Sequence, residues 1–523
     1  MIITPHEDHA SRPSRLTLIR VPEQPLPNLP DSPAHIALPA WLAIGLVAGT
    51  SAIVLVLEIL AGRLLAPYVG VSLETYTGII GTILIGIAVG AWAGGTMADR
   101  VNPRRLLPPL LMLGGALAIA TIPTVRLIGS ASNGSGGGLR IIALSALGFL
   151  PSATVLSAVP PAVIKLQLRD LGATGATVGR LSAWSTGGAI VGTFFTGFFL
   201  VAAAPVSTLI VAIGLGLIAS GGALSVFGRA HGFVVESGQL FSVAGIAALG
   251  LLGTATIASP CDTQTSYYCL AVRVDADRPG GRTLVLDDLR HSYVDLDDPT
   301  HLEFWYIRRL ADVIALAPRT EVVFLGGGAL TLPRQVRATS PHTQQLVFEI
   351  DDGLIDVVEA EFGYRPSASI EVRIDDARLG LVGVDTDSAD VVIGDAFGSR
   401  SVPFHLATEE FTRDVRRVLR STGTYAVNVI DSPGQRFLAA QAATLGRVFE
   451  YVAVVLGPQA AAGQHGNSVL IASDEPIDVL ALDQRRVDAG DGGEVVSDLA
   501  GLIVDAPILT DDYAPVDQLI ASG

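Results

Sequence analysis

The sequence has few histidines, little positive charge and only two cysteines. Its nine histidines form no cluster with metal-ligand spacing, so a metal site has no support. Positive charge is scarce, because 34 lysines and arginines face 50 acids, and the net charge of -16 argues against nucleic acid as a partner. The only cysteines, Cys261 and Cys269, either pair in an oxidising compartment or remain two small apolar residues.

Long apolar runs are absent after Cys261, and this absence divides the chain. With 50% hydrophobic residues and a mean hydropathy of +0.50, the whole is too apolar for one soluble fold. Seven runs near the ~20 residues that cross a hydrocarbon core precede that point, at about 38–60, 76–98, 106–125, 140–164, 181–203, 206–228 and 238–259. We predict an all-α, multi-pass membrane domain over residues 37–260, with the lipid bilayer of the cell membrane as its partner.

The ends of these runs bear on orientation. Residues 1–36 are rich in proline and charge and are predicted to be a disordered tail, while the first run is too long for a removable signal peptide. Basic loops hold Arg100, Arg104 and Arg105, then Lys165, Arg169 and Arg180, then Arg229, which places the N-terminus in the cytoplasm. An odd number of crossings then puts the C-terminal domain outside. One miscounted helix reverses this result, so the side stays open.

Two features inside the apolar runs are relevant to packing and transport. Glycines recur at helical spacing, at Gly86, Gly90 and Gly94 and again at Gly188 and Gly192, which predicts close helix contacts. Glu58 is the one acid well inside a run, so it is either a transport candidate or a partner of Arg63 or of a loop arginine. No run carries the several polar groups expected along a solute path.

The remainder reads as an α/β domain behind a small β-ribbon. Residues 261–300 hold two strand-like runs, Gln264–Asp275 and Gly281–Asp295, joined by a turn at Pro279, Gly280 and Gly281. From residue 301 to 523 helical and strand patterns alternate, which predicts a doubly wound, mainly parallel, Rossmann-like sheet of the methyltransferase type.

The segment from Val322 to Asp352 is typical of a nucleoside-binding βαβ unit. Gly326, Gly327 and Gly328 let the backbone turn sharply and approach a ligand, and Glu349 about 20 residues later can accept the ribose hydroxyls. Two further acids, Asp376 and Asp395, follow later strands. Because ligands of such sheets bind beyond the carboxyl ends of the strands, we expect these three acids to face one cavity.

Five segments carry a family resemblance. In order and spacing, LVLDDLRHSYVD, FLGGGALTLPRQV, FEID, IDDAR and DVVIGDAFGSRSVPFHLATEEF resemble the polyamine aminopropyltransferases, best known as spermidine synthases. The resemblance covers residues 261 to about 460. Together with EILAGRLLAPYVG and LTDDYAPVDQL, the layout looks like the bacterial branch that carries a membrane domain ahead of the synthase domain.

The resemblance implies an enzyme that transfers the aminopropyl group of decarboxylated S-adenosylmethionine, a co-substrate, to putrescine or a related amine. The products would be spermidine and methylthioadenosine, with no permanently bound cofactor. By motif position, Asp395 carries over as the base, Glu349 as the acceptor of the ribose hydroxyls, and Asp376 with Ala377 as the adenine contact. A homo-oligomer is a further implication.

The chain departs from the family pattern on the amine side. The departures are Tyr268, Ile307, Ala329, Gly398 and His291. Candidates for binding the amine are therefore Asp287, His291 and Tyr306, or Asp511 and Asp512 folded back from the C-terminus. A structural role for His291, and a turn-capping role for Asp511 and Asp512, are the simpler alternatives.

Three functional hypotheses follow. The first is a membrane-bound aminopropyltransferase. The second keeps the nucleoside pocket but uses a different acceptor, or transfers a methyl group. The third is a permease or polyamine sensor whose synthase-like domain binds ligand without catalysis.

Overall fold

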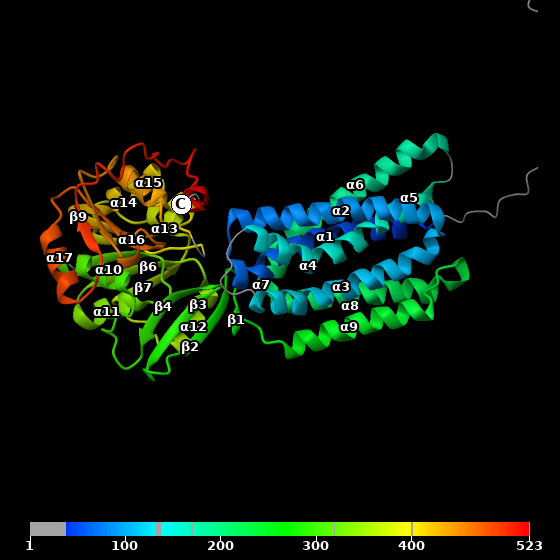
Figure 1. Ribbon diagram of the computed structural model, residues 1–523, viewed down its shortest axis with the longest axis horizontal. Helices are drawn as coiled ribbons and strands as arrows, with labels where there is room; N and C mark the ends of the chain where they lie inside the picture. The colour runs from blue at the N-terminus through cyan, green and yellow to red at the C-terminus, as the bar shows by residue number, and fades with distance from the viewer. Residues whose placement is uncertain (1–37, 132–137, 169–170, 318–319, 399–400, 522–523) are drawn as a thin grey trace, which may run out of the picture.

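The computed structural model describes residues 38–131, 138–168, 171–317, 320–398 and 401–521 (Figure 1). A bundle of long helices is followed by a small antiparallel sheet and then by an α/β domain. The small sheet lies between the bundle and the rest of the α/β domain (Figure 1). The predicted tail at residues 1–36, and Arg169, lie outside the described residues.

Seven helical segments among the described residues are long and apolar enough to cross a membrane. They are α1 (Ala40–Val69), α2 (Leu73–Arg100), α3 (Pro103–Ala131), α4 with α5 (Gly138–Ser157, Val159–Gln167), α6 continuing through η2 to α7 (Thr174–Phe195, Thr196–Leu200, Val201–Ala203), α8 (Val206–Phe227) and α9 (Ser237–Thr256). Short 3-10 turns, η1 (Leu171–Ala173) and η3 (Arg229–His231), precede α6 and follow α8. Each predicted apolar run overlaps one segment.

The small-residue faces bring helices together as predicted. A Cβ on Gly90 of α2 would lie 2.2 Å from the carbonyl oxygen of Thr154 in α4, and one on Gly188 of α6 would lie 2.2 Å from that of Ala48 in α1. Only glycine permits these approaches. The alternative pairing of Arg63 with Glu58 is not formed, because the Arg63 guanidinium donates to backbone oxygens outside the bundle.

The β-ribbon has four antiparallel strands in the order β1 (Thr263–Gln264), β2 (Cys269–Val274), β3 (Gly281–Leu286) and β4 (Leu289–Asp295). The predicted turn between β2 and β3 is confirmed. The single strand predicted over Gln264–Asp275 is wrong: it is split by a turn at Thr265–Tyr268, which we call the tyrosine turn. Within this turn, Thr265 N–H donates to the carbonyl oxygen of Tyr268. A disulfide joins Cys261, which precedes β1, to Cys269, the first residue of β2.

The α/β domain has an eight-stranded sheet in the order β12-β10-β11-β9-β8-β5-β6-β7. Its strands are β5 (Glu321–Leu325), β6 (Gln344–Glu349), β7 (Ile370–Ile374), β8 (Ala389–Gly394), β9 (Leu419–Asp431), β10 (Tyr451–Leu456), β11 (Gly466–Ser473) and β12 (Glu494–Val496). The strands β7, β6, β5, β8 and β9 are parallel, and β11, β10 and β12 add antiparallel pairs. All six residues of central β8 are buried, as expected where helices cover both faces.

Helices connect these strands and cover the sheet. They are α10 (Trp305–Leu316), α11 (Thr331–Thr339), α12 (Asp352–Glu361), α13 (Ala377–Val382), α14 (Glu409–Val418), α15 (Arg436–Leu445), α16 (Pro458–Ala461), α17 (Val479–Asp488) and α18 (Val516–Ala521), with the 3-10 turn η4 (Phe404–Leu406). The predicted doubly wound, mainly parallel sheet is confirmed. Its parallel strands present their carboxyl ends at one edge, where the site is built.

Candidate active site

A cavity of about 180 Å³ lies at the carboxyl ends of β5, β6 and β8. Four carboxylates from this edge line it: Glu349, Asp375, Asp376 and Asp395. Tyr267 and Tyr268 of the tyrosine turn form part of its wall. This space, called the nucleoside cavity below, is therefore strongly acidic and is built jointly by the sheet and the ribbon.

The glycine turn after β5 requires its glycines. Gly326 has φ +102°, and a Cβ there would lie 2.6 Å from the carbonyl oxygen of Asp395. Gly328 has φ +49°, and a Cβ there would lie 2.6 Å from the Ser292 hydroxyl oxygen. L-residues with a side chain rarely adopt such angles, so the turn can lie this close to the acids only with glycine.

Glu349 stands at the end of β6 and is held by backbone donors. Its Oε2 accepts from the N–H groups of Gly327 at 2.9 Å and Gly328 at 3.2 Å, and its Oε1 accepts from Asp351 N–H at 3.1 Å. Burial raises the pKa of Glu349, while these three hydrogen bonds oppose the shift. Because a carboxylate offers about four acceptor positions, the oxygens retain capacity for ligand hydroxyls.

Asp376 caps helix α13 and faces the same cavity. Its Oδ1 accepts from the N–H groups of Arg378 at 2.9 Å and Leu379 at 3.2 Å, while Oδ2 lies 3.0 Å from Nε2 of His405. Ala377 lines the cavity beside it. The capping role satisfies helix N–H groups, so it explains the orientation of the carboxylate without excluding a ligand contact.

Asp395 follows β8 and is partly buried. Its Oδ1 accepts from Nδ2 of Asn428 at 2.8 Å, and Oδ1 of Asn428 accepts from Nδ2 of Asn467 at 3.0 Å. Burial raises the pKa of Asp395 to about 6, an effect that the Asn428 hydrogen bond opposes. The carboxylate is thus ionised at neutral pH, yet more basic than a solvated aspartate.

A second cavity of about 790 Å³ adjoins the first. The two share His291 and Phe397 as walls, and Asn428, the partner of Asp395, lines the second. We call it the acceptor cavity. It is bounded by aromatic residues of α10 and by three charged residues, Arg290, Glu303 and Arg308. Asp395 therefore lines the first cavity and is joined to the wall of the second through Asn428.

This chain is similar to a curated protein and to several solved structures. No family model matches the chain. A curated polyamine aminopropyltransferase from Vibrio vulnificus (strain CMCP6) is 28% identical over 145 residues, which make up 27% of this chain and 48% of that relative. The chain thus spans about half the length of the curated relative that it matches. The resemblance to the polyamine aminopropyltransferases is confirmed.

Two solved structures are similar to about half of this chain. A probable spermidine synthase from Corynebacterium glutamicum is 25% identical, with 49% of this chain and 97% of that chain covered and a TM-score of 0.46. The spermidine synthase from Thermotoga maritima is 18% identical, with 48% and 84% covered and a TM-score of 0.36.

The ribbon and the α/β domain, within residues 261–521, are called the aminopropyltransferase-like domain below. This domain brings together the residues predicted for the nucleoside side. Gly326, Gly328, Glu349, Asp376, Ala377 and Asp395 all line the nucleoside cavity. Gly327 contributes through its hydrogen bond to Glu349. The expectation that three acids from three strand ends face one cavity is met, while their individual roles remain predictions.

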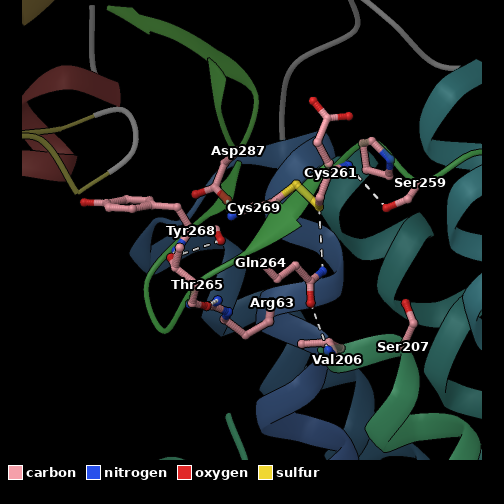
Figure 2. The surroundings of a disulfide bond; sticks show 12 residues. Arg63, Val206, Ser207, Ser259, Cys261, Gln264, Thr265, Tyr268, Cys269 and Asp287 are labelled. Carbon is pink, nitrogen blue, oxygen red and sulfur yellow. Dashed lines mark hydrogen bonds between the residues drawn. A yellow bond between two sulfur atoms is a disulfide. The ribbon is translucent and has the colours of Figure 1, made fainter. Parts of the chain in front are cut away.

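The residues predicted for the amine side are only partly brought together. Asp287 lies outside both cavities: its Oδ1 accepts from Cys269 N–H at 3.0 Å in the β3–β4 turn (Figure 2), and burial raises its pKa to about 6. Asp511 is engaged by Arg378 in two hydrogen bonds of 2.6 and 2.7 Å. Asp512 lines neither cavity. These local partners keep Asp287 and Asp511 from the acceptor cavity.

His291 and Tyr306 do reach the acceptor cavity. Burial lowers the pKa of His291 to about 4, so the ring is neutral at pH 7, and its Nδ1 has no hydrogen-bond partner among the described residues. The Tyr306 hydroxyl lies 3.5 Å from the carbonyl oxygen of His291, and burial raises the pKa of this phenol. Both side chains therefore act as neutral polar groups.

The other departures from the family pattern have a structural explanation. Ile307 and Ala329 are buried in the apolar core between the ribbon and the sheet, so no polar group faces a ligand there. Tyr268 donates to the carbonyl oxygen of Phe397 at 3.1 Å, and Gly398 lines the nucleoside cavity.

Sequence reasoning missed several residues of the site, among them Tyr267, Arg290, Glu303, Asp375, His405 and Asn428. Asn428 carried a usable signal, because it is a single amide in the apolar strand TYAVNVI. Glu303 and His405 carried none, since an isolated acid or histidine in a loop is usually solvated.

Proposed function

We propose that the chain is a membrane-bound aminopropyltransferase that uses decarboxylated S-adenosylmethionine and putrescine or a related amine. The observation that carries this is the convergence of Glu349, Asp376 and Asp395 on one cavity beside the glycine turn. An acidic cavity favours a sulfonium cation. Glu349 would accept the ribose hydroxyls and Asp376 with Ala377 would contact the adenine.

Asp395 lines the nucleoside cavity and its partner Asn428 lines the acceptor cavity, an arrangement that suits a direct displacement. The neutral amine nitrogen attacks the methylene carbon beside the sulfonium sulfur, so a C–N bond forms as the C–S bond breaks and the sulfur retains the electron pair. Asp395 receives the proton released by the amine. A carboxylate with a pKa of about 6 is ionised at neutral pH and can take this proton. Holding the amine and the sulfonium in line lowers the activation barrier further.

Glu303 is the acid we propose for the far end of a diamine. It lines the acceptor cavity, whereas Asp287 and Asp511 are engaged elsewhere. Its Oε2 lies 3.3 Å from Nε2 of His301, and the side chain is 43% exposed, so a second partner can reach it. An ammonium at one end and the nucleophile near Asp395 would span the cavity.

A different acceptor is the second candidate, and Arg290 favours it. The Arg290 guanidinium stacks over the Phe304 ring, 5.2 Å from its centroid, and pairs with no carboxylate among the described residues. Arg308 lines the same cavity but is paired with Asp491. An unpaired guanidinium attracts a carboxylate, so an ω-amino acid fits this cavity as well as a diamine.

One assay separates these candidates. The full-length chain in detergent is incubated with decarboxylated S-adenosylmethionine and one of two acceptors of similar length, putrescine or 4-aminobutyrate, with a control that lacks an acceptor. The release of methylthioadenosine is followed. Release with putrescine, lost in Asp395→Asn and weakened in Glu303→Gln, supports the first proposal. Release only with 4-aminobutyrate, lost in Arg290→Gln, supports the second. Ligand binding without release from any acceptor favours a non-catalytic sensor.

We also propose that the aminopropyltransferase-like domain faces the oxidising side of the cell membrane. The α2 helix begins next to this domain, where Leu73 N–H donates to Asp517, so Arg100 marks the far end of the bundle. That end also holds Arg104, Arg105, Lys165, Arg180 and Arg229. The positive-inside rule places it in the cytoplasm, and the Cys261–Cys269 disulfide at the near end agrees.

A further inference from the structure

The tyrosine turn forms a wall of the nucleoside cavity, although it belongs to the segment that leaves the membrane bundle. Tyr267 and Tyr268 line the cavity, and the Tyr267 side chain remains 45% exposed at its mouth. At about 180 Å³ the cavity is small beside the roughly 300–1,000 Å³ of most ligand pockets. A small shift of this wall therefore changes a large share of the space available to a ligand.

The first membrane helix holds the turn. From α1, Arg63 donates through Nη1 to the carbonyl oxygen of Ser266 at 2.7 Å and through Nη2 to that of Thr265 at 2.5 Å. Figure 2 shows Arg63 reaching from the bundle toward Thr265. Gln264, just before the turn, accepts from Val206 N–H at the start of α8 at 2.8 Å. Two membrane helices thus fix one hairpin.

The same turn continues into the site on its other side. The Thr265 hydroxyl donates to Oδ2 of Asp351, whose own N–H donates to Oε1 of Glu349 at 3.1 Å. On the opposite flank Tyr268 donates to the carbonyl oxygen of Phe397, two residues after Asp395. An unbroken series of contacts therefore runs from Arg63 to the carboxylate expected to hold the ribose.

The disulfide limits how far the turn can move. Cys261 and Cys269 lie eight residues apart and close the hairpin that carries the turn, and Cys269 N–H donates to Asp287. The charge of Arg63 also acts on Asp287 and Asp351, lowering the pKa of both against the larger effect of burial. The disulfide closes the hairpin, and the hydrogen bonds from Arg63 fix where the tyrosine turn lies relative to the bundle.

We infer that the membrane domain completes the nucleoside cavity, with Arg63 as a positioning residue that holds the tyrosine turn against Glu349. Arg63 touches no reacting atom and acts through Thr265 and Ser266. The inference rests on the proposed function for the identity of its ligand. It assigns the membrane domain a part in substrate binding that is separate from anchoring and from transport.

The test uses the full-length chain in nanodiscs and methylthioadenosine as the probe, with affinity measured by calorimetry. Arg63→Gln and Thr265→Val should each weaken binding about tenfold, since each removes hydrogen bonds in which one partner is charged, the Arg63 guanidinium or the Asp351 carboxylate. KM for decarboxylated S-adenosylmethionine should rise in parallel, with a smaller change in kcat. Arg63→Lys should recover part of the loss, because an ammonium can still reach one carbonyl. Arg105→Gln, at the far end of the bundle, is the matched control and should bind as the parent does.

Parent-like affinity in Arg63→Gln overturns the inference, even if Thr265→Val is impaired, because the membrane helix then contributes nothing. If Arg63→Gln does not fold, Arg63→Lys is compared with Arg105→Lys, and equal affinities overturn it. A loss confined to kcat also counts against a positioning role in binding. If the parent chain binds no methylthioadenosine, both the proposed function and this inference are wrong. If the parent chain binds methylthioadenosine and is active, and the variants behave as the parent does, only the inference is wrong.

Discussion

The side-chain amide of Asn428 donates to the carboxylate of Asp395, with 2.8 Å between Nδ2 and Oδ1. Asn428 is itself oriented by Asn467, so the amide presents its N–H and not its carbonyl oxygen to the acid. This contact opposes the effect of burial on the pKa of Asp395. The balance of the two leaves a carboxylate that is ionised at neutral pH and lines the nucleoside cavity.

Replacing Asp395 by asparagine should lower kcat by roughly 10²–10⁴-fold, the usual contribution of a general base. Stability should not fall. The pKa of Asp395 is about 6 in the folded state, above its value of 3.8 in the unfolded chain. The charged carboxylate therefore destabilises the fold increasingly as the pH rises from 3.8, and above pH 6 the cost is on the order of 2–3 kcal/mol. At pH 8, thermal unfolding of Asp395→Asn should therefore occur at or above the parental temperature. A lower unfolding temperature would contradict the assigned burial cost.

Replacing Asn428 by alanine should move the acid limb of the pH profile. In the parent, kcat/KM at a constant concentration of neutral amine should rise with pH and level off above about 6, because Asp395 must be ionised. Loss of the Asn428 hydrogen bond raises the pKa of Asp395, so the midpoint should shift to higher pH and kcat should fall at pH 7. An unchanged midpoint would mean that another group controls the profile.

Replacing Glu349 by glutamine should weaken methylthioadenosine binding by about tenfold or more. Both carboxylate oxygens accept from backbone N–H groups of Gly327, Gly328 and Asp351. A glutamine amide must turn its NH₂ toward one of these donors, which leaves a hydrogen bond unmade in a buried site. Calorimetric titration of the full-length variant measures the loss. Glu371→Gln, on the exposed side of β7, serves as a control of equal chemistry.

The proposed orientation predicts the behaviour of C-terminal reporters. A periplasmic-type alkaline phosphatase fused after Gly523 should be active, and a fluorescent protein that matures only in the cytoplasm should stay dark. The two cysteines should resist a thiol reagent in intact cells until a reductant is added. The opposite pattern of reporter activity, with free thiols, would place the aminopropyltransferase-like domain in the cytoplasm.

Local patterns predicted much of this chain. Apolar runs of spanning length identify helices directly, since each must satisfy its own backbone groups in lipid. The glycine turn at Gly326 and the acids at Glu349, Asp376 and Asp395 follow from strand ends, because parallel strands deliver those ends to one edge. The strand predicted over Gln264–Asp275 is split because the Thr265 hydroxyl accepts from the N–H groups of Tyr267 and Tyr268, and this local turn competes with strand pairing.

The sequence by itself determined most of the helices and strands, which helices are long and apolar enough to cross a membrane, and which three acids share an edge, because these depend on residue type and spacing along the chain. Only the tertiary structure decided which polar groups reach the cavities. Asp287 accepts a hydrogen bond from Cys269 N–H, and Asp511 accepts from Arg378. Glu303 and Asn428, in contrast, line the acceptor cavity. It also joined Arg63 to Thr265, 202 residues apart in the chain. Such partners are set by packing between distant elements, which no local periodicity encodes.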